Sequence, residues 1–397
     1  MPEATLRFYI IGKLFSYYIK TRSACRTALT LREVLSNFLG GYMKLKNMEK
    51  ITTGFYNTPI HKLENLSKKY GINIYIKRDD LTGYATGGNK LRKLDYLLKD
   101  ALDNECTVLL TYGGQQTNHG RLTAAVAARF GLRCGIIMDG PAPEKASGNL
   151  ILDKMMGADL FFMDDTSFKD DQDDVKAAKY KQLVDKTTAE VLKMYEDQGE
   201  KVYMIPIGGS SPLGAAGYVM AAKEIKDQLE EMKVKIDYVF TGFGSVGTYG
   251  GLYLGAKYFD AGFKTVGISI SHKNEAELQE KIRYIQETSD YLELGVDVSK
   301  DDLWIEEGYV GISYNVPDPV TRRYMYMMAR EEAIILDACY TGKVFRGMIE
   351  MIQEGKISKD KNVMLLHTGG IPGIFSESHS AAMQEELWGE PQKEFKL

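Results

Sequence analysis

The sequence predicts an α/β fold with mainly parallel sheets and helices on both faces. Two observations lead to this prediction. Short apolar or β-branched segments alternate along the chain with helical segments, and glycine pairs follow several of the apolar segments. Strands that alternate with helices usually pair in parallel, because each helix carries the chain back across the sheet. Each sheet is therefore expected to be buried between two layers of helices.

Each expected element is a short run with a regular pattern. Residues 90–101 carry leucines at helical spacing with charged residues on the opposite face, and residues 122–130 form an alanine-rich helix. The polar stretch 164–186 is expected to be a solvated helix or loop. The apolar runs are typical of strands, and the expected strands are residues 72–76, 107–112, 134–138, 160–163, 202–207, 238–241, 266–269 and 363–367.

The composition excludes several classes of protein. Of the 397 residues, 44% are hydrophobic and 26% charged, which is typical of a globular protein and not of a disordered chain, a collagen or a membrane bundle. The 50 basic and 54 acidic residues give a net charge of −4, which does not indicate nucleic-acid binding. The four cysteines have no paired spacing. We therefore expect no disulfide framework and no metal site, and a cytoplasmic protein.

The first 47 residues differ from the rest and are expected to be an extension without catalytic residues. They hold eight basic residues and only two acidic ones. Their apolar run, residues 8–19, is interrupted by Lys13 and is shorter than the roughly 20 residues that span a membrane. A transit peptide, an additional helix and a wrongly assigned start before Met43 or Met48 all fit this composition.

Four glycine-rich or polar segments lie where strands are expected to end, which is where open α/β sheets bind ligands. The first holds Lys90 directly after Gly87, Gly88 and Asn89, at the start of the expected helix 90–101. A cation is disfavoured at a helix N-terminus because the helix dipole is positive there. Lys90 is therefore either a solvated surface residue or an amine held against a ligand, whose pKa desolvation would lower.

The second segment, residues 111–119, precedes the helix 122–130. Its main-chain N–H groups could hold a carboxylate, although Thr117 and Asn118 could also be ordinary helix caps. The third segment holds Gly244, Ser245, Val246, Gly247 and Thr248 after the strand 238–241. It lacks the lysine of an ATP-binding loop and the acidic residue of a dinucleotide site, so it indicates either a single phosphate or a tight turn.

The fourth group combines Thr368, Gly369 and Gly370, after the strand 363–367, with two segments that each contain a loop tyrosine. These tyrosines are Tyr314 and Tyr340, and the second is followed by Thr341. The chain contains 25 tyrosines, so a loop tyrosine alone does not indicate a function.

Taken together, these motifs resemble the fold type II pyridoxal phosphate enzymes, the group similar to tryptophan synthase β. Within that group the chain resembles the 1-aminocyclopropane-1-carboxylate deaminase and D-cysteine desulfhydrase family. The matching stretches run from about residue 54 to residue 375 and include IKRDDLTG, GGNKLRKLDYLL, GGQQTNHGR, PIGGSSPLGAAGY, GSVGT, YTGK and HTGG. The resemblance implies two three-layer α/β/α domains with mainly parallel twisted sheets. Residues 48–94 and 211–397 would form the large domain, and residues 95–210 the small inserted domain.

The resemblance also implies roles for individual residues. Lys90 would bind the cofactor pyridoxal 5′-phosphate covalently, Lys93 and the third segment would hold its phosphate, and Asn118 would bond its 3′-oxygen. Thr117, Asn118 and His119 would hold the substrate carboxylate, with Thr117 at a position where the family usually has serine. The other implied site residues are the two active-site tyrosines, Tyr314 and Tyr340, and two residues near the ring nitrogen, Thr341 and Thr368.

Thr341 and Thr368 are typical of the desulfhydrases, whereas the deaminases typically have glutamate and leucine there. A threonine hydroxyl would leave the ring nitrogen mainly neutral, and the weaker electron sink favours β-elimination. We therefore expect a lyase that converts D-cysteine to pyruvate, ammonia and hydrogen sulfide.

The alternatives are 1-aminocyclopropane-1-carboxylate deamination and elimination from another β-substituted amino acid. A cofactor-binding protein without turnover and a nicotinamide dehydrogenase are less favoured. The expected partners are a small amino acid and a second copy in a homodimer, not nucleic acid or a membrane.

Overall fold

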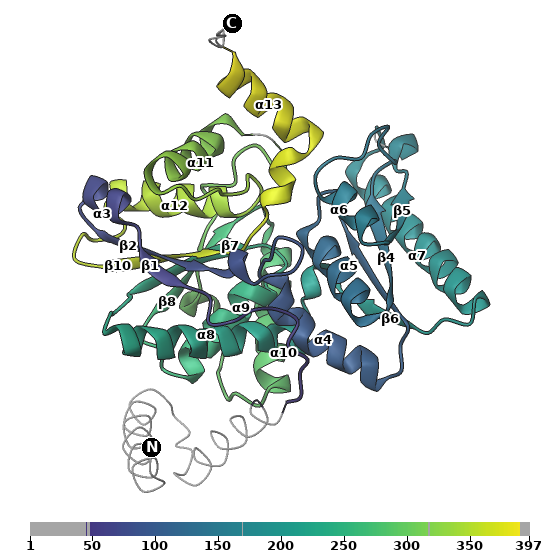
Figure 1. The fold of residues 1–397 in the computed structure, drawn as a ribbon, viewed down its shortest axis with the longest axis horizontal. Coiled ribbons are helices and arrows are strands. Elements are labelled where there is room, and N and C mark those ends of the chain that lie inside the picture. The colour runs from purple at the N-terminus through teal and green to yellow at the C-terminus, as the bar shows by residue number, and fades with distance from the viewer. Residues whose placement is uncertain (1–44, 46–47, 169, 317, 390–397) are drawn as a thin grey trace, which may run out of the picture.

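The protein contains two β-sheets, and helices cover both faces of each (Figure 1). The computed structural model describes residues 45, 48–168, 170–316 and 318–389. Apart from Leu45, the predicted N-terminal extension therefore lies outside the described residues. The larger sheet has six strands in the order β1-β2-β10-β7-β8-β9, and the smaller sheet has four in the order β5-β4-β3-β6.

The larger sheet is parallel except at one edge, where β1 pairs antiparallel with β2. Helices α3, α11 and α12 cover one face, and α8 and α9 cover the other, with α10 packed on them (Figure 1). The strands are β1 (Ile60–Lys62), β2 (Asn73–Arg78), β7 (Tyr238–Phe243), β8 (Lys264–Ser269), β9 (Trp304–Glu306) and β10 (Asn362–His367). The helices are α3 (Glu64–Tyr70), α8 (Pro212–Met232), α9 (Gly247–Tyr258), α10 (Glu275–Tyr291), α11 (Pro319–Glu332) and α12 (Thr341–Gln353).

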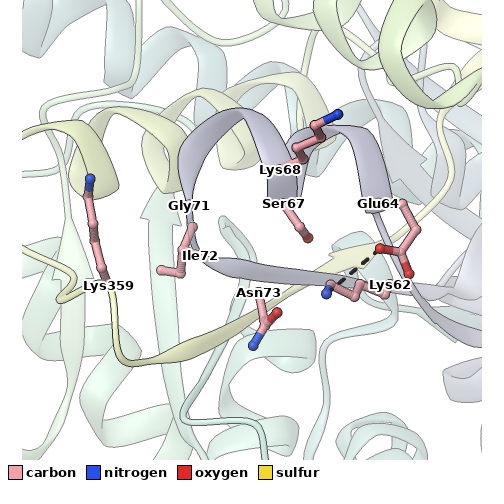
Figure 2. A pocket seen from close by; sticks show the side chains of 8 residues that line it. All are labelled: Lys62, Glu64, Ser67, Lys68, Gly71, Ile72, Asn73 and Lys359. Carbon is pink, nitrogen blue, oxygen red and sulfur yellow. Dashed lines mark ion pairs between the residues drawn. The ribbon is translucent and has the colours of Figure 1, made fainter.

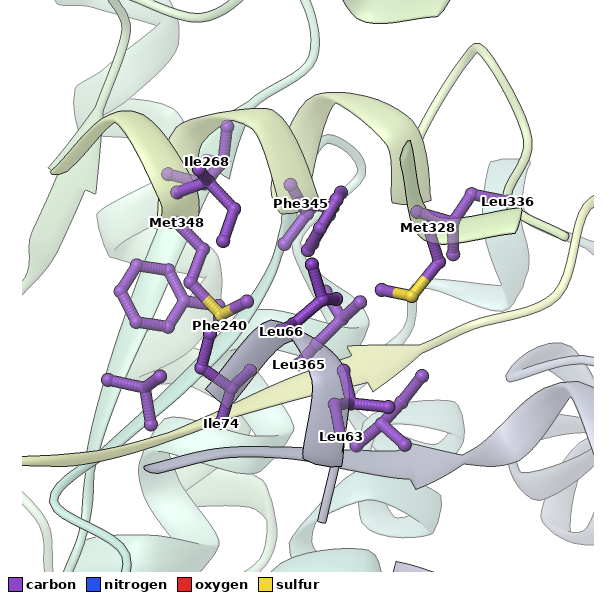
Figure 3. Close-up of a cluster of buried hydrophobic side chains, with 14 of the residues drawn as sticks. Leu63, Leu66, Ile74, Phe240, Ile268, Met328, Leu336, Phe345, Met348 and Leu365 are labelled. Atoms are coloured by element: carbon purple, nitrogen blue, oxygen red, sulfur yellow. The ribbon is translucent and has the colours of Figure 1, made fainter. Parts of the chain in front are cut away.

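Side chains of the central strands alternate between two hydrophobic clusters, one on each face of the larger sheet. Val363 and Leu365 of β10 pack with α3, α11 and α12, whereas Met364 and Leu366 pack with α8 and α9. Figure 3 shows the first cluster, in which Phe345 of α12 lies over the sheet. Burial on both faces explains why these strands are continuous apolar runs in the sequence. Truncating a buried phenylalanine such as Phe345 typically costs about 3–5 kcal/mol.

The smaller sheet is entirely parallel and has the same layered construction. Helices α5 and α6 cover one face and α7 covers the other (Figure 1). Helix α4 (Lys90–Asp103) contributes leucines to the core beside α5 and also packs on α8, so it joins the two sheets. The other elements are β3 (Val108–Gly113), β4 (Arg133–Asp139), β5 (Asp159–Met163), β6 (Val202–Ile205), α5 (Asn118–Phe130), α6 (Asn149–Met155) and α7 (Asp173–Asp197).

The predicted α/β fold with mainly parallel sheets is confirmed, and each predicted strand overlaps an observed one. The sequence analysis missed β1 and β9, which have three residues each and are only half-buried, so they lack an apolar pattern. The polar stretch 164–186, predicted as a solvated helix or loop, includes the first half of α7. All strands of the smaller sheet lie within residues 108–205, inside the predicted inserted segment 95–210, whose limits stay a prediction.

Candidate active site

Lys90 is the first residue of α4 and lies between loops that follow strands of both sheets. Its Nζ donates a hydrogen bond to the carbonyl of Gly208, after β6, at 3.3 Å. The N–H of Asn89 bonds the carbonyl of Thr368, after β10, at 3.1 Å and holds the helix start. Burial lowers the pKa of Lys90 to about 8. About a tenth of the amine is then neutral at pH 7, so Lys90 can act as a nucleophile.

Lys93 lies one turn further along α4 and is fully buried. Its Nζ donates to the same Gly208 carbonyl at 3.0 Å and to Ser210 Oγ at 3.3 Å. Burial and the nearby charge of Lys90 lower the pKa of Lys93 well below its usual value. Among the ion pairs of the described part of the chain, none involves either lysine. The buried amine of Lys93 and the half-buried Lys90, both without a carboxylate partner among the described residues, form a site that favours an anion.

The loop between β7 and α9 contributes a helix N-terminus to this anion site. Val246 has a left-handed backbone with φ of 71°, which is rare for a β-branched residue and marks a constrained turn. A Cβ on Gly247 would lie 2.8 Å from Lys93 Nζ and 2.7 Å from Ser210 Oγ, so a side chain there would displace the amine or the hydroxyl. A helix N-terminus beside a buried lysine is suited to bind one phosphate.

Two side chains connect this loop to its neighbours. Ser245 Oγ accepts a hydrogen bond from Ser210 Oγ at 2.9 Å, and Thr248 Oγ1 accepts one from Asn89 Nδ2 at 2.9 Å. The structure therefore brings Gly244, Ser245, Val246, Gly247 and Thr248 together with Lys90 and Lys93. Their role in phosphate binding stays a prediction.

The N-terminus of α5 forms a second group of donors. Thr117 caps this helix, because its hydroxyl accepts the N–H of Gly120 at 3.2 Å. The amide oxygen of Asn118 accepts bonds from Asn149 Nδ2 at 3.1 Å and Arg121 Nη2 at 3.4 Å, which leaves the amide N–H₂ of Asn118 available. The first N–H groups of a helix have no acceptor within it. This end of α5 can therefore hold a carboxylate.

His119 is buried and neutral, since burial and the charges of Lys90 and Lys93 lower its pKa well below the usual value. Its Nε2 lies 2.9 Å from Thr111 Oγ1, which itself donates to the Ile205 carbonyl. Nε2 must therefore carry the proton, and Nδ1, which has no partner in the described structure, has only a lone pair. The imidazole thus offers an acceptor, whereas a bond to a substrate carboxylate, which we predicted, needs a donor.

Tyr314, in the loop between β9 and α11, lies next to Tyr340, the residue directly before α12. Their hydroxyl oxygens lie 2.6 Å apart, and the rings meet edge to face. Tyr314 is 41% exposed as a whole residue, but its hydroxyl faces Tyr340, and burial raises the pKa of both phenols. Tyr340 also lies beside Gly242 at the end of β7, just before the loop that leads to α9.

Thr341 is fully buried at the start of α12, and both hydrogen bonds of its hydroxyl are made with Asp337. Thr341 Oγ1 donates to Asp337 Oδ1 at 2.6 Å and accepts the N–H of Asp337 at 2.8 Å. The same carboxylate accepts the N–H groups of Cys339, Tyr340 and Thr341. Thr368 is different, because no partner of its hydroxyl occurs in the part of the chain that the structure describes.

Sequence analysis missed two features that support the site. Gly208 is left-handed with φ of 69°, and a Cβ there would lie 2.4 Å from Ser245 Oγ and 3.3 Å from Lys90 Nζ. The glycine pair in PIGGSS, directly after an expected strand, was a signal for this contact. The second feature is a buried ion network, in which Arg92 of α4 bonds both Asp79 and Glu224 and fixes the start of the helix that carries Lys90.

Two cavities of the described structure are lined by neither Lys90, Lys93 nor the two tyrosines. One of about 250 Å³ lies between α3 and β2 and is lined by Lys62, Lys68 and Lys359 among others (Figure 2). The other, of about 290 Å³, is lined by Lys50, Tyr56 and their neighbours on α4 and α8. Among the described residues, no helix is long and apolar enough to cross a membrane.

These residues fit the cofactor that the resemblance implies. The buried Lys93, the half-buried Lys90 and the N-terminus of α9 match a phosphate group, since neither lysine has an acidic partner in the described structure. The lowered pKa of Lys90 matches an amine that bonds an aldehyde. Glycines at 208 and 247 keep the backbone close to both lysines, where any side chain would fill the space.

Comparison with known proteins agrees with this geometry. The family model "Pyridoxal-phosphate dependent enzyme" matches residues 51–369. A 1-aminocyclopropane-1-carboxylate deaminase of Bradyrhizobium diazoefficiens is 34% identical over 83% of this chain and 97% of its own length. A D-cysteine desulfhydrase of Yersinia enterocolitica is 35% identical over 80% of this chain and 93% of its own. The crystal structure of an ACC deaminase homologue, 33% identical, covers 88% of this chain and 99% of its own with a TM-score of 0.72. This chain therefore belongs to the pyridoxal-phosphate dependent enzymes, in the family of the 1-aminocyclopropane-1-carboxylate deaminases and D-cysteine desulfhydrases.

Proposed function

We propose that this protein is a lyase that cleaves D-cysteine by β-elimination to pyruvate, ammonia and hydrogen sulfide. The observation that carries the proposal is that positions 341 and 368 are both threonine. Thr341 has its hydroxyl fixed on Asp337, whose carboxylate is saturated by four donors of the α12 N-terminus. Neither position therefore contributes a free carboxylate to the site. The similarity to the Yersinia desulfhydrase supports the same activity.

When bound, pyridoxal phosphate supplies a carbonyl carbon for a substrate amine and a ring that withdraws electrons from the neighbouring carbon. Lys93 and the N-terminus of α9 would hold its phosphate. Lys90, as a neutral amine, has the lone pair that accepts a proton from the substrate α-carbon. The N-terminus of α5 would hold the substrate carboxylate, with the free hydroxyl proton of Thr117 and the N–H₂ of Asn118 as donors.

The tyrosine pair would deliver the proton that the departing sulfur needs. Two phenols at 2.6 Å share one hydrogen bond, so one of them keeps a free O–H for another acceptor. Burial raises the pKa of both, so both stay protonated near neutral pH. A protonated donor of this kind assists departure of HS⁻ from the β-carbon.

The test is an assay of the purified protein, loaded with the cofactor, on D-cysteine, L-cysteine and 1-aminocyclopropane-1-carboxylate in parallel. Sulfide and pyruvate are measured with the cysteines, and ammonia and 2-oxobutanoate with the cyclopropane acid. We expect the largest kcat/KM with D-cysteine. A larger kcat/KM with the cyclopropane acid would overturn the assignment, and Lys90→Ala serves as the inactive control.

A second candidate is deamination of 1-aminocyclopropane-1-carboxylate. The similarity to the Bradyrhizobium deaminase favours it, and the same assay separates the two activities. On the resemblance we also propose a homodimer in the cytoplasm. Gel filtration with light scattering tests the first part, and fractionation of the source cells tests the second.

A further inference from the structure

Lys343 is a fully buried lysine of α12, one turn after Tyr340. Its Nζ donates to two main-chain carbonyls, that of Ser313 at 2.8 Å and that of Ile270 at 3.1 Å. Among the ion pairs of the described residues, none includes this ammonium group. Lys343 therefore connects three separate segments: helix α12, the end of β8 and the loop before α11.

The nearby carboxylates are occupied by other partners. Asp318 accepts bonds from Thr321 and Arg346, and Asp337 accepts those of the α12 N-terminus. Burial lowers the pKa of Lys343, and the charges of these two carboxylates only partly oppose that effect. A buried ammonium group with carbonyl partners alone is costly compared with an apolar side chain of similar length. Stability by itself therefore does not explain a lysine at this position.

The part of the loop that Lys343 reaches lies at the surface: Ile312, Ser313 and Tyr314 are exposed, whereas Tyr309 and Val310, earlier in the loop, are buried. In residues 307–316 the main-chain hydrogen bonding that the structure describes is limited to two turns, at residues 308–309 and 314–315. Tyr314 of this loop bonds Tyr340, and Asn315 Oδ1 lies 3.2 Å from His379 Nε2. The bond from Lys343 fixes the main chain at the residue directly before Tyr314.

We propose that Lys343 is a positioning residue for the tyrosine pair. It draws the main chain of Ser313 onto α12, the helix that begins beside Tyr340, and so sets the distance between the two hydroxyl groups. Lys343 does not touch the reacting atoms in this arrangement. It acts through Tyr314, and the proposal rests on the role of that tyrosine in the proposed lyase reaction.

The test uses Lys343→Met in the cofactor-loaded enzyme, since methionine has a similar length but no charge or donor. With whichever substrate the wild type turns over, we expect kcat to fall about 10- to 100-fold and KM to stay within about twofold of the wild type. This loss is smaller than the rate enhancement that a positioned acid or base typically contributes, because Tyr314 is displaced and not removed. Lys226→Met is the matched control, because Lys226 of α8 also donates to a main-chain carbonyl, that of Phe259 at 2.8 Å. The control should leave kcat unchanged.

Two further measurements separate positioning from general destabilisation. If Lys343 acts through Tyr314, adding Lys343→Met to Tyr314→Phe should cost little beyond the single Tyr314→Phe change. Hydrogen exchange should increase in peptides of residues 307–316 and stay unchanged in α9. Fully additive losses in kcat, or unchanged exchange in 307–316, would overturn the proposal.

The design keeps this proposal separable from the proposed function. If Lys343→Met does not fold, Lys343→Gln, which is too short to reach both carbonyls, should give the same changes in exchange and kcat. If the wild type processes none of the three amino acids, the proposed function fails. The exchange measurement then still decides whether Lys343 fixes the loop.

Discussion

Replacing Thr341 by glutamate should destabilise the protein, because the structure places a carboxylate directly beside this position. Thr341 is fully buried and makes two hydrogen bonds to Asp337, at 2.6 and 2.8 Å. Their loss costs about 1 kcal/mol each. A second carboxylate at about 5 Å from Asp337 adds a repulsion of about 3 kcal/mol at an effective dielectric constant of 20. The sum, about 5 kcal/mol, is a large part of a typical folding free energy of about 5–15 kcal/mol.

The repulsion can be separated from the other terms by a double-mutant cycle. In Thr341→Glu with Asp337→Asn the second charge is absent. The double variant should therefore lose about 3 kcal/mol less unfolding free energy than the two single variants lose in total. Thr341→Gln is the neutral control of the same shape and should show little such coupling with Asp337→Asn. Urea unfolding at pH 7, followed by circular dichroism, measures all of these free energies.

The same variants test the substrate assignment. Thr341→Glu with Thr368→Leu should raise the ratio of kcat/KM for the cyclopropane acid to that for D-cysteine, and the shift should be larger once Asp337→Asn relieves the repulsion. A Thr341→Glu protein as stable as the wild type, or a coupling energy near zero, would refute the electrostatic reasoning. An unchanged ratio in the folded triple variant would refute the idea that these threonines select the substrate.

Three other predictions follow from single sites. Covalent attachment of pyridoxal phosphate to Lys90, measured by visible absorbance, should rise with pH through a midpoint near 8, because burial lowers the pKa of Lys90 to about 8. A midpoint near 10 would contradict this reasoning. The control Lys90→Ala should show no attachment. Burial raises the pKa of Asp153 from 3.8 to about 7, so the native state holds a proton that the unfolded state loses, and stability should fall by up to about 4 kcal/mol between pH 4 and pH 7. Asp153→Asn should remove this slope in urea unfolding, and an unchanged slope would assign it to other groups. Gly208→Ala places a Cβ 2.4 Å from Ser245 Oγ at a left-handed backbone, so a weaker affinity for pyridoxal phosphate is expected by titration, whereas Gly199→Ala, which has open space, should bind normally.

The sequence alone determined the local elements and the identity of the main site segments. Strands buried on both faces are continuous apolar runs, and the glycine-rich turns after them mark the edge where ligands bind. Lys90 could be singled out because a lysine at a helix start is electrostatically unfavourable. The short strands β1 and β9 could not be predicted, because three half-buried residues leave no periodic pattern.

Only the tertiary structure decided which segments meet and in which direction their hydrogen bonds run. Gly208 contacts Lys90 across 118 residues, and Arg92 bonds Glu224 across 132, because α4 lies between the two sheets and packs on α8. The sequence shows a hydroxyl at Thr341 but not that Asp337 occupies it. It shows a histidine at 119 but not that its N–H is used on Thr111. A residue's chemistry is local, whereas its available donors and acceptors depend on the neighbours that folding brings to it.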